Sequence, residues 1–306
     1  YNATTLAFGQ SSPGEPQNIV TVAGVGPYIG DGSKADEAGL HLVEGVAFDN
    51  AGNLWIADTG NNRIRMVDAA SNIISTVAGT GFAGFSGDGR IGTEAKPNSP
   101  SDLALDPSGN LYFTDAGNNR IRRIDAVTHI ITTVAGSGDQ PGYSGDGGAA
   151  TDATFFSPRG IALAVDGSNV TIYTADQFNH VVRKINPAGM VSTVAGNNKQ
   201  GNSTDCALAT QCSLNLPFGV ALDTAGNFYI GEGGVGASGG ENGFSNRVRK
   251  VDAGTQRLTT VVGKLGPWGT SGEAGNSPDG TPVADALINS PRDIAFDAAG
   301  NLYFLD

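Results

Sequence analysis

Short runs of alternating apolar and polar residues recur along the chain, separated by Gly, Asn and Asp. The first four runs, GVAFD, LWIAD, RIRMVD and IISTVAG, lie at residues 45–49, 54–58, 63–68 and 73–79. Each run is rich in β-branched or aromatic residues and ends at turn-forming residues, which is typical of strands. The DNAGN sequence after the first run favours a tight turn, because Asp bonds its own backbone and Gly accepts a positive φ. The pattern predicts four antiparallel strands per unit and no long amphipathic helix.

This four-strand pattern repeats, so that five copies can be aligned along the chain. The copies lie at residues 44–68, 101–125, 159–186, 218–252 and 292–306, and the last one ends after its second predicted strand. A TVAG-like segment begins at Thr21, Thr76, Thr133, Thr193 and Thr260, which gives successive spacings of 55, 57, 60 and 67 residues. A period of this length, with several strands in each unit, indicates a propeller or another closed array.

Three features recur in register: the D-x-x-G-N turn, the D-x-x-N-R-I-R step and the long connections that contain Gly-Asp-Gly. In these features the chain resembles the NHL-repeat family over nearly its whole length. Its connections look most like those of large secreted bacterial NHL proteins and of the teneurin propeller. The resemblance implies an all-β fold, a β-propeller of four-stranded antiparallel blades. NHL propellers commonly have six blades, whereas this chain supplies five units.

The two ends of the chain complement each other. The fifth unit lacks its third and fourth strands, whereas the N-terminus supplies Thr4–Phe8 and Ile19–Gly24 without a first and second strand. We expect both ends to build one blade, which would hide both sheet edges. This predicts a single five-bladed domain over residues 1–306, and the alternative is a six-bladed or truncated propeller. The predicted blade units are approximately 25–79, 80–136, 137–196, 197–263, and 264–306 together with 1–24.

Composition excludes several protein classes. Gly accounts for 46 of the 306 residues without occupying every third position, and charged residues make up only 16 %, which excludes a collagen and a coiled coil. No apolar run approaches the roughly 18 residues that a membrane-spanning helix needs, so we expect no transmembrane segment. The formal net charge of −12 argues against a nucleic-acid partner and fits a cationic ligand, a divalent metal or a basic protein surface, and the alternative is that it serves solubility alone.

Strand direction alternates within a blade, so the long connections and the turns between second and third strands open on one face, the long-loop face. Loops on a rigid scaffold are a common location for binding sites. Acidic residues end the second strands there: Asp58, Asp115, Asp176, Glu232 and Asp306. Each either caps its own turn or pairs with the nearby Arg63, Arg120 or Arg247. The alternative is a ring that holds Ca²⁺ through oxygen ligands alone, and we expect no other cofactor.

The long connections add a second set of candidates. Their acidic residues are Asp31, Asp88, Asp146 and Asp279, and their aromatic residues are Tyr28, Phe85, Tyr143 and Trp268. The Gly-Asp-Gly steps indicate tight turns rather than anion sites, because no helix or Lys follows as a phosphate loop requires. The aromatic residues either pack between blades or form a rim for a sugar or a partner protein. The Gly-rich insertion Gly231–Ser245 either orders on binding through Phe244 or serves as a spacer.

Residues at the starts of the first strands line the predicted channel mouth and vary between units. They are Glu44, Asp102, Arg159, Phe218, Arg292 and Asp293. Arg159 and Arg292 are the best candidates for holding a ligand carboxylate, because a guanidinium binds it bidentately. The alternative is that these two arginines pair with Glu44 and Asp102.

Evidence for catalysis in the sequence is thin. His41, His129 and His180 occupy different parts of different units, and no nucleophile elbow is present. The resemblance implies that some related propellers are lyases or hydrolases. Aligned with the other units, His180 takes the place of Arg63 and Arg120, and with Asp176 it would form the acid–base pair to test.

Several local features point to an oxidising compartment. Cys206 and Cys212 either form a local disulfide or remain a free thiol pair. The sequence starts at Tyr1 without Met, as after signal-peptide cleavage, although a trimmed chain would look the same. Glycosylation sequons begin at Asn2, Asn169 and Asn202. Extracellular or periplasmic localisation is therefore expected.

Together these observations favour a secreted or cell-surface recognition scaffold without enzymatic activity. It would bind a protein or a carbohydrate through the long-loop face. The first alternative is an enzyme of the lyase or hydrolase type with its site at the channel mouth. The second is a structural subunit of an extracellular assembly.

Overall fold

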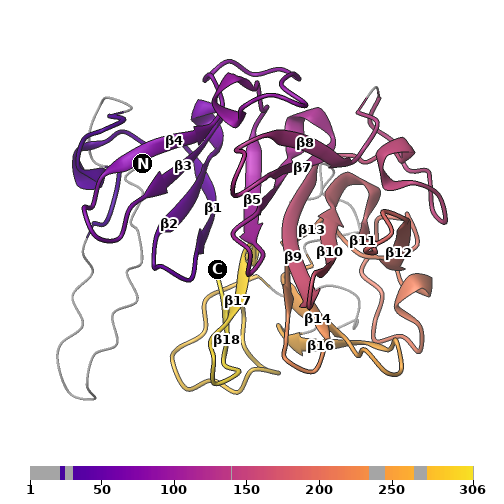
Figure 1. Cartoon of the computed structure of the whole chain (residues 1–306). Coiled ribbons are helices and arrows are strands. Elements are labelled where there is room, and N and C mark those ends of the chain that lie inside the picture. The colour runs from indigo at the N-terminus through magenta and orange to yellow at the C-terminus, as the bar shows by residue number, and fades with distance from the viewer. Residues whose placement is uncertain (1–20, 25–29, 139, 234–244, 265–273, 306) are drawn as a thin grey trace. The chain divides into compact units, whose positions relative to one another are not determined.

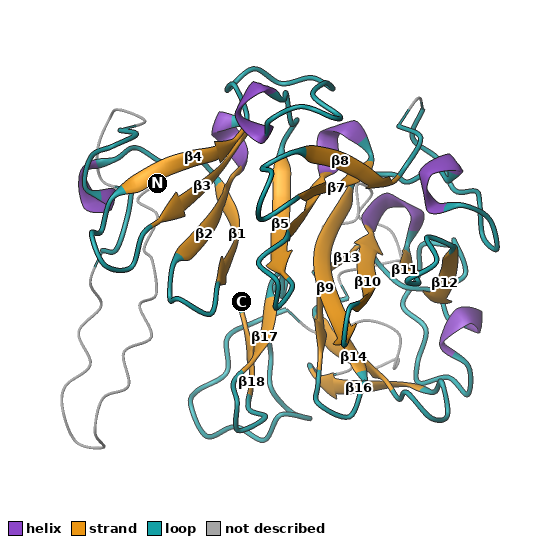
Figure 2. Ribbon diagram, viewed as in Figure 1, coloured by secondary structure: helices purple, strands orange, loops and turns teal. Residues whose placement is uncertain are grey.

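The computed structural model describes residues 21–24, 30–138, 140–233, 245–264 and 274–305. Within these ranges the chain forms antiparallel sheets joined by loops and short 3₁₀ helices, and no described residue lies in an α-helix (Figure 1 and Figure 2). None of the described helices has the length and apolar character needed to cross a membrane. By its internal contacts the chain divides into two compact units, residues 1–111 with 124–132 and residues 112–123 with 133–306.

Four sheets have four strands each, and neighbouring strands follow one another in sequence. The first sheet contains β1 (Val43–Phe48), β2 (Leu54–Asp58), β3 (Arg63–Val67) and β4 (Ile74–Ala78). The second contains β5 (Pro100–Leu105), β6 (Leu111–Asp115), β7 (Arg120–Ile124) and β8 (Ile131–Ala135). The third contains β9 (Pro158–Asp166), β10 (Asn169–Asp176), β11 (Val181–Ile185) and β12 (Val191–Ala195). The fourth contains β13 (Pro217–Leu222), β14 (Phe228–Glu232), β15 (Arg247–Val251) and β16 (Leu258–Val262).

A fifth sheet has two described strands, β17 (Ile294–Phe296) and β18 (Leu302–Phe304). The 3₁₀ helices η1, η3, η5 and η7 lie in the long connections before the first strand of each four-stranded sheet, at Ala35–Glu37, Gly92–Glu94, Ala150–Asp152 and Ala209–Gln211. The helices η2, η4 and η6 lie between the second and third strands of the first three sheets, at Thr59–Asn61, Ala116–Asn118 and Gln177–Asn179. The predicted all-β fold with four-stranded antiparallel units is confirmed.

The N-terminal segment differs from the prediction where it can be compared. The described end of the predicted strand Ile19–Gly24, residues 21–24, is not a strand. Instead Gly24 turns the chain with a positive φ of 98° and donates its N–H to the carbonyl of Ala35 at 3.1 Å. Ala23 packs beside Ala35 in a small apolar cluster. Thr4–Phe8 lies outside the described residues, so the shared closing blade, the single domain and the number of blades stay predictions.

The long connections cover the outer edges of the fourth strands. Beside β12, Gly147 donates its N–H to Val191 at 2.8 Å, and Val191 donates back to Gly148 at 3.0 Å. Beside β16, Cys206 and Leu258 exchange hydrogen bonds of 3.0 and 3.1 Å in the same way. A covered edge offers no free ladder to another chain. These two connections are therefore structural parts of the sheets that follow them.

Strand β14 of the fourth sheet is buried on both faces, which explains its nearly continuous apolar sequence from Phe228 to Gly231. On β14, Phe228 and Ile230 join one apolar cluster with residues of the third sheet, whereas Tyr229 joins a second cluster with Ile294. Ring contacts tie the layers together: Tyr173 lies 5.4 Å from Phe228, and Tyr229 lies 4.8 Å from Phe296, between ring centroids. Successive residues of a strand face opposite sides, so a strand between two apolar layers needs an almost continuous apolar sequence.

Gly136 and Gly147, both in the second compact unit, differ in how much space surrounds their Cα atoms. Gly136 and Gly147 both have positive φ, 94° and 80°. A Cβ on Gly136 would collide with the carbonyl oxygen of Asn119, whereas a Cβ on Gly147 would meet no atom within 4 Å. We expect Gly147→Ala to lower the free energy of unfolding by about 1–2 kcal/mol through backbone strain alone. Gly136→Ala must also displace backbone and should cost clearly more.

Urea denaturation of the two variants beside the wild type measures both losses. Equal losses for Gly136→Ala and Gly147→Ala would contradict the close backbone approach at Gly136.

Candidate functional site

The candidate site lies at the end of the sheets where first strands begin and second strands end. In the third sheet, Asp176 at the end of β10 is paired in register with Pro158 at the start of β9. The connection before β9 and the turn η6 therefore meet at this end, which we call the long-loop end. The same pairing places Pro217 opposite Glu232 in the fourth sheet.

A fully buried arginine lies near this end in each four-stranded sheet: Arg65, Arg122, Arg183 and Arg249. Each forms an ion pair with the acid that ends the second strand. The N···O distances are 3.5 Å to Asp58, 3.2 Å to Asp115, 3.6 Å to Asp176 and 3.3 Å to Glu232. These four acids are also fully buried.

Asp58 pairs with Arg65 rather than with the predicted Arg63, whereas Arg247 pairs with Glu232 as predicted, at 3.2 Å. Arg63 donates to the carbonyls of Asn61 and Thr80 at 3.3 and 3.0 Å. Arg120 likewise donates to the carbonyls of Asn118 and Ser137. In the first sheet the guanidinium group of Arg63 therefore turns towards backbone carbonyls, and Arg65 reaches the buried acid.

An acid from a long connection also reaches the buried Arg65, Arg183 and Arg249. The N···O distances are 2.7 Å for Arg65–Asp31, 2.9 Å for Arg183–Asp146 and 3.7 Å for Arg249–Asp205. The loop acids are partly exposed, with 41–49 % of their side chains accessible. The Gly-Asp-Gly connections thus supply counter-ions as well as turns, and Asp205 takes this role where the Gly-Asp-Gly sequence is absent.

The acids at the ends of the second strands also accept hydrogen bonds from N–H groups of the connections and turns. Asp176 accepts the N–H of Phe156 at 2.7 Å and the side-chain amide of Asn179 at 2.8 Å. Burial raises the pKa of Asp176 to about 7, although these hydrogen bonds and Arg183 act in the opposite direction. Burial also raises the pKa of Asp58, against a hydrogen bond from the N–H of His41. These contacts hold the connection and the turn to the sheet.

No group of three or more His, Cys, Asp or Glu side chains arranged to bind a metal is present in the described parts of the chain. Asp306, the fifth member of the predicted acidic ring, lies outside those parts. A Ca²⁺ site formed by the ring stays a prediction. The contacts of Asp58, Asp115, Asp176 and Glu232 are those of buried ion pairs.

His180 occupies the place of Asn62, Asn119 and Asn246, which corrects its predicted alignment with Arg63. All four residues have positive φ, and each accepts a backbone N–H from the start of the next repeat. His180 accepts through Nδ1 from Leu216 at 3.2 Å. Burial lowers the pKa of His180 to about 4, against an opposing effect of Glu232. His180 is therefore a neutral acceptor that links repeats.

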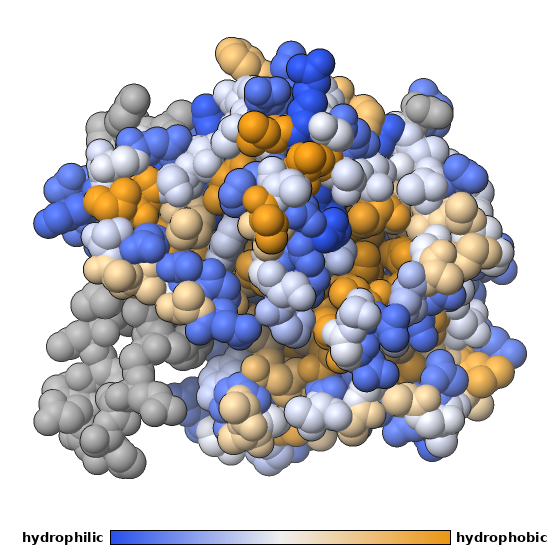
Figure 3. Space-filling view, viewed as in Figure 1, coloured by the Kyte–Doolittle hydropathy of each residue, from blue (hydrophilic) through white to orange (hydrophobic). Residues whose placement is uncertain are grey.

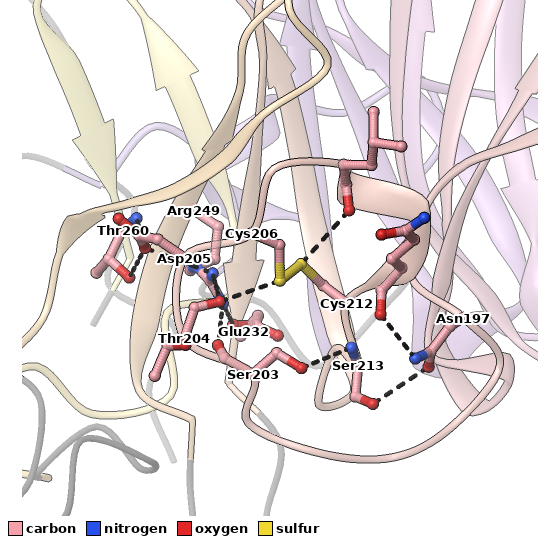
Figure 4. Close-up of a disulfide and its surroundings, with 12 residues drawn as sticks. Asn197, Ser203, Thr204, Asp205, Cys206, Cys212, Ser213, Glu232, Arg249 and Thr260 are labelled. Carbon is pink, nitrogen blue, oxygen red and sulfur yellow. Dashed lines mark hydrogen bonds and ion pairs between the residues drawn. A yellow bond between two sulfur atoms is a disulfide. The ribbon is translucent and has the colours of Figure 1, made fainter.

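Cys206 and Cys212 form a disulfide rather than a free thiol pair. Figure 4 shows it beside the buried pair of Glu232 and Arg249, in the connection that also carries Asp205. Across the base of this loop, Ser213 donates its N–H to the hydroxyl of Ser203 at 2.8 Å. The disulfide and these contacts fix the connection that supplies the counter-ion of Arg249.

An exposed aromatic pair, Phe156 and Phe178, lies at the long-loop end of the third sheet and was missed by sequence reasoning. Exposed hydrophobic side chains are interspersed with hydrophilic ones on the face shown in Figure 3, so exposure alone does not define a site. These two rings, however, are in contact, with centroids 4.8 Å apart and planes inclined by 51°. They are 39 % and 44 % exposed.

The sequence does contain a signal for this pair. Phe156 begins an F-S-P sequence where the corresponding connections at 98–100 and 289–291 read N-S-P. Phe178 stands where the first two repeats have Gly60 and Gly117. The third repeat thus places aromatic rings where other repeats place small or polar residues.

Three of the predicted channel-mouth residues come together within the second compact unit. The guanidinium carbons of Arg159 and Arg292 lie over the Phe218 ring, 5.6 and 5.5 Å from its centroid. Phe218 is 9 % exposed, Arg159 is half-buried and Arg292 is exposed. Burial raises the pKa of the neighbouring Asp293 to about 6, opposed by a hydrogen bond from the N–H of Ile294.

The other channel-mouth residues have contacts of their own in the first unit. Glu44 accepts a hydrogen bond from the hydroxyl of Ser101 at 2.7 Å, and Asp102 accepts one from the N–H of Leu103 at 2.8 Å. The alternative pairing of Arg159 and Arg292 with Glu44 and Asp102 joins residues of different units, and it stays a prediction.

The remaining candidate residues differ in their contacts and in their exposure to solvent. Tyr143 packs over Arg183, 5.0 Å from the ring centroid to the guanidinium carbon, and its hydroxyl contacts that of Thr193 at 2.8 Å. Phe85 is 45 % exposed. The sequons at Asn169 and Asn202 lie on an exposed hairpin and on a partly buried connection. Several candidates fall outside the described residues: Asn2, Tyr28, Phe244, Trp268, Asp306 and residues 234–244 of the insertion.

Two family models match parts of the chain. The NHL repeat model matches residues 40–65, and the teneurin NHL domain model matches residues 127–205. The chain is 27 % identical over 289 residues to Protein SUPPRESSOR OF QUENCHING 1, chloroplastic, of Arabidopsis thaliana, covering 90 % of the chain and 25 % of that protein. It is 24 % identical over 311 residues to NHL repeat-containing protein 2 of Bos taurus, covering 93 % and 40 %.

Among solved structures, the crystal structure of a nidogen/laminin complex resembles the chain with a TM-score of 0.54 and 16 % identity. The match covers 87 % of this chain and 72 % of that chain. At this identity the likeness concerns the fold. The chain spans less than half the length of the two relatives named above.

The buried ion pairs lead to a further prediction about stability. Arg183→Met leaves Asp176 buried without its cation, so we expect the free energy of unfolding to fall by about 3–5 kcal/mol. Adding Asp176→Asn should recover part of this loss, because the uncompensated carboxylate is removed. Arg257→Met, at an exposed site, should stay within about 0.5 kcal/mol of the wild type. Chemical denaturation measures all four proteins, and a near-neutral Arg183→Met would contradict this role.

The lowered pKa of His180 leads to another prediction. An unfolded chain protonates this imidazole below its ordinary pKa of 6.5, but the folded chain does so only near 4. Wild-type stability therefore falls between these values as the pH is lowered. His180→Asn keeps an acceptor for Leu216 and removes the titration. Its stability relative to the wild type should rise from about pH 7 to about pH 5 in urea denaturation. A difference that does not change with pH would count against a buried neutral imidazole.

Proposed function

Because the chain is built of NHL repeats in a β-propeller fold, we propose that it is a non-enzymatic recognition scaffold that binds a partner protein through the long-loop end. The observation that carries this proposal is the exposed contact between Phe156 and Phe178. Large aromatic side chains at the centre of an interface supply much of its binding free energy.

Backbone contacts hold the two rings in place before any partner arrives. Phe178 donates its N–H to the carbonyl of Phe156 at 3.2 Å. Phe156 donates its own N–H to the buried Asp176 at 2.7 Å, and the amide of Asn179 donates to Gly142 at 2.7 Å. The connection and the turn are therefore fixed to each other and to the sheet. Anchors that are already ordered lose little conformational entropy on binding.

The fold does not require these aromatic residues. In the first repeat Gly60 donates its N–H to the carbonyl of His41 at 2.8 Å, the same contact that Phe178 makes to Phe156. Glycine thus satisfies the backbone geometry in that repeat. The aromatic area in the third repeat is an addition to a constant frame, which supports a role in recognition.

The shape of the pair favours a protein over a carbohydrate. With their planes inclined by 51°, the two rings do not present one continuous flat face. A sugar stacks best on a flat, open ring face. Carbohydrate binding remains the alternative partner chemistry, and the experiment below separates the two.

The other expected functions have weaker support. The contacts of His180 and Asp176 link repeats and neutralise Arg183, so they do not favour the lyase or hydrolase alternative. The structural-subunit alternative has no specific observation in its favour. The Cys206–Cys212 disulfide supports an oxidising, extracellular or periplasmic location as part of this proposal.

The test uses a variant that restores the residues of sister repeats, Phe156→Asn with Phe178→Gly. Peptides are selected with the wild-type chain from a phage-displayed random library, and their affinities are measured by surface plasmon resonance. Loss of the anchors should weaken binding of the selected peptides by about 30-fold, the equivalent of one strong hot spot. Phe48→Ser is the matched control, because Phe48 is 61 % exposed at the opposite end of its own sheet.

Two results would contradict the proposed protein-binding function. Selected peptides that bind the double variant as tightly as the wild type would show that the aromatic pair is not the site. A glycan array that gives signal with the wild type and none with the double variant, without any selected peptide, would assign the pair to carbohydrate.

A further inference from the structure

We infer that the Cys206–Cys212 disulfide is a redox-sensitive latch: it holds one connection over the outer edge of β16, and its reduction releases that edge. The inference goes beyond the proposed function, because it concerns a different sheet and a conformational change rather than a bound partner. The residues of the latch all lie within the second compact unit. Figure 4 shows the disulfide and the part of the connection that precedes it.

The connection pairs with β16 immediately before the disulfide. Cys206 donates its N–H to the carbonyl of Leu258 at 3.0 Å, and Leu258 donates its N–H to the carbonyl of Cys206 at 3.1 Å. The carboxylate of Asp205 accepts the N–H of Thr260 at 2.8 Å and its hydroxyl at 3.2 Å. Two consecutive residues of the connection therefore occupy the outward-facing groups of two alternate residues of β16.

Glycines form the corresponding turn in two other repeats. The sequences at residues 86–89 and 144–147 read S-G-D-G, whereas residues 203–206 read S-T-D-C. The last glycine of this motif has a positive φ, 78° at Gly89 and 80° at Gly147, which glycine adopts without steric cost. Cys206 stands in this place and is not among the residues with positive φ. The fourth connection therefore lacks the glycine turn.

The first glycine of the motif closes the connection of the third repeat. A Cβ on Gly145 would lie 2.6 Å from the Cβ of Ala153, so only glycine permits this approach. Ala153 and Cys212 both follow the 3₁₀ helix of their connection as its C-cap. In the fourth repeat Thr204 takes the place of Gly145 and Cys212 that of Ala153. There the disulfide closes the connection in place of the glycine contact.

A dithiol reductant can break this closure. Cys206 is half-buried and Cys212 is fully buried, so the thiolate of the reductant reaches the sulfur of Cys206 first. Its attack forms a mixed disulfide and releases the sulfur of Cys212 as a thiolate, which takes up a proton. The second thiolate of the reductant then displaces the sulfur of Cys206 and forms a cyclic disulfide. Two electrons thus pass from the reductant to the cysteines.

Reduction leaves the connection with hydrogen bonds and the Arg249–Asp205 ion pair. The N···O distance of this pair is 3.7 Å, and the Asp205 side chain is 41 % exposed, so solvent weakens the attraction. In the loop-closure model, a link between residues six apart in sequence opposes opening by roughly 40-fold. Loss of the link therefore favours opening of the connection, which uncovers the ladder groups of Leu258 and Thr260.

The test follows backbone amide hydrogen exchange in the full chain by NMR at constant pH, with and without dithiothreitol. After reduction, confirmed by thiol titration, the amides of Leu258 and Thr260 should exchange roughly 40-fold faster. The matched control is the amide of Val191, which donates to Gly148 at 3.0 Å at the equivalent edge of β12. No disulfide closes that connection, so the exchange of Val191 should stay the same.

Two variants separate the latch from a general effect of the reductant. Cys206→Ala with Cys212→Ala should exchange like the reduced chain, whether or not dithiothreitol is present. Thr204→Gly with Cys206→Gly and Cys212→Ala restores the S-G-D-G sequence and the alanine of the third repeat. This triple variant should keep the two β16 amides protected under both conditions. Unchanged exchange of these amides on reduction, or an equal acceleration at Val191, would overturn the inference.

Discussion

Each four-stranded sheet depends on neutralising at least one buried guanidinium. Removing an arginine from water is costly unless acids of suitable geometry surround it. Arg183 meets this requirement with Asp176 from the end of β10 and Asp146 from the preceding connection. Both acids must reach the same side chain, so the connection and the turn are held at fixed places on the sheet. In the third sheet, the described loops at the long-loop end are therefore fixed to the strands.

The strands could be predicted from the sequence because their signals come from residues close together in the chain. Period-2 alternation and the Asp-Asn turn act within a few residues: Asp49 accepts backbone N–H groups from Ala51 and Asn53, both at 2.9 Å. The partner of a buried acid is different, because it depends on which side chain turns inward. Arg63 is nearer to Asp58 in sequence, yet Arg65 is the residue that reaches it. Alignment could have shown this, since the Arg65 position holds arginine in all four repeats but the Arg63 position holds Val181 in the third.

The aromatic pair and the place of His180 were missed for a related reason. Phe178 and His180 both lie in the turn after the second strand. An error of one residue in the alignment of the repeats assigns each of them to the wrong equivalent residue. Counting from Asp176 places His180 with Asn62, and Phe178 with Gly60. The predicted carboxylate ligands Arg159 and Arg292 could be named from the sequence, but their common contact with Phe218 could not. That contact arises from the packing of successive repeats, which no single repeat encodes.

The path of the connections determines which stretch of sequence must be copied when such a chain gains a repeat by duplication. The segment that covers β12 and supplies Asp146 precedes the third sheet in sequence, and the segment that covers β16 and supplies Asp205 precedes the fourth. A copied stretch that begins with the connection and ends with the following fourth strand would carry its own edge cover and its own counter-ion. A stretch copied from first strand to fourth strand would carry neither. The unit that can be duplicated with all its contacts therefore begins one connection before the first strand of the sheet.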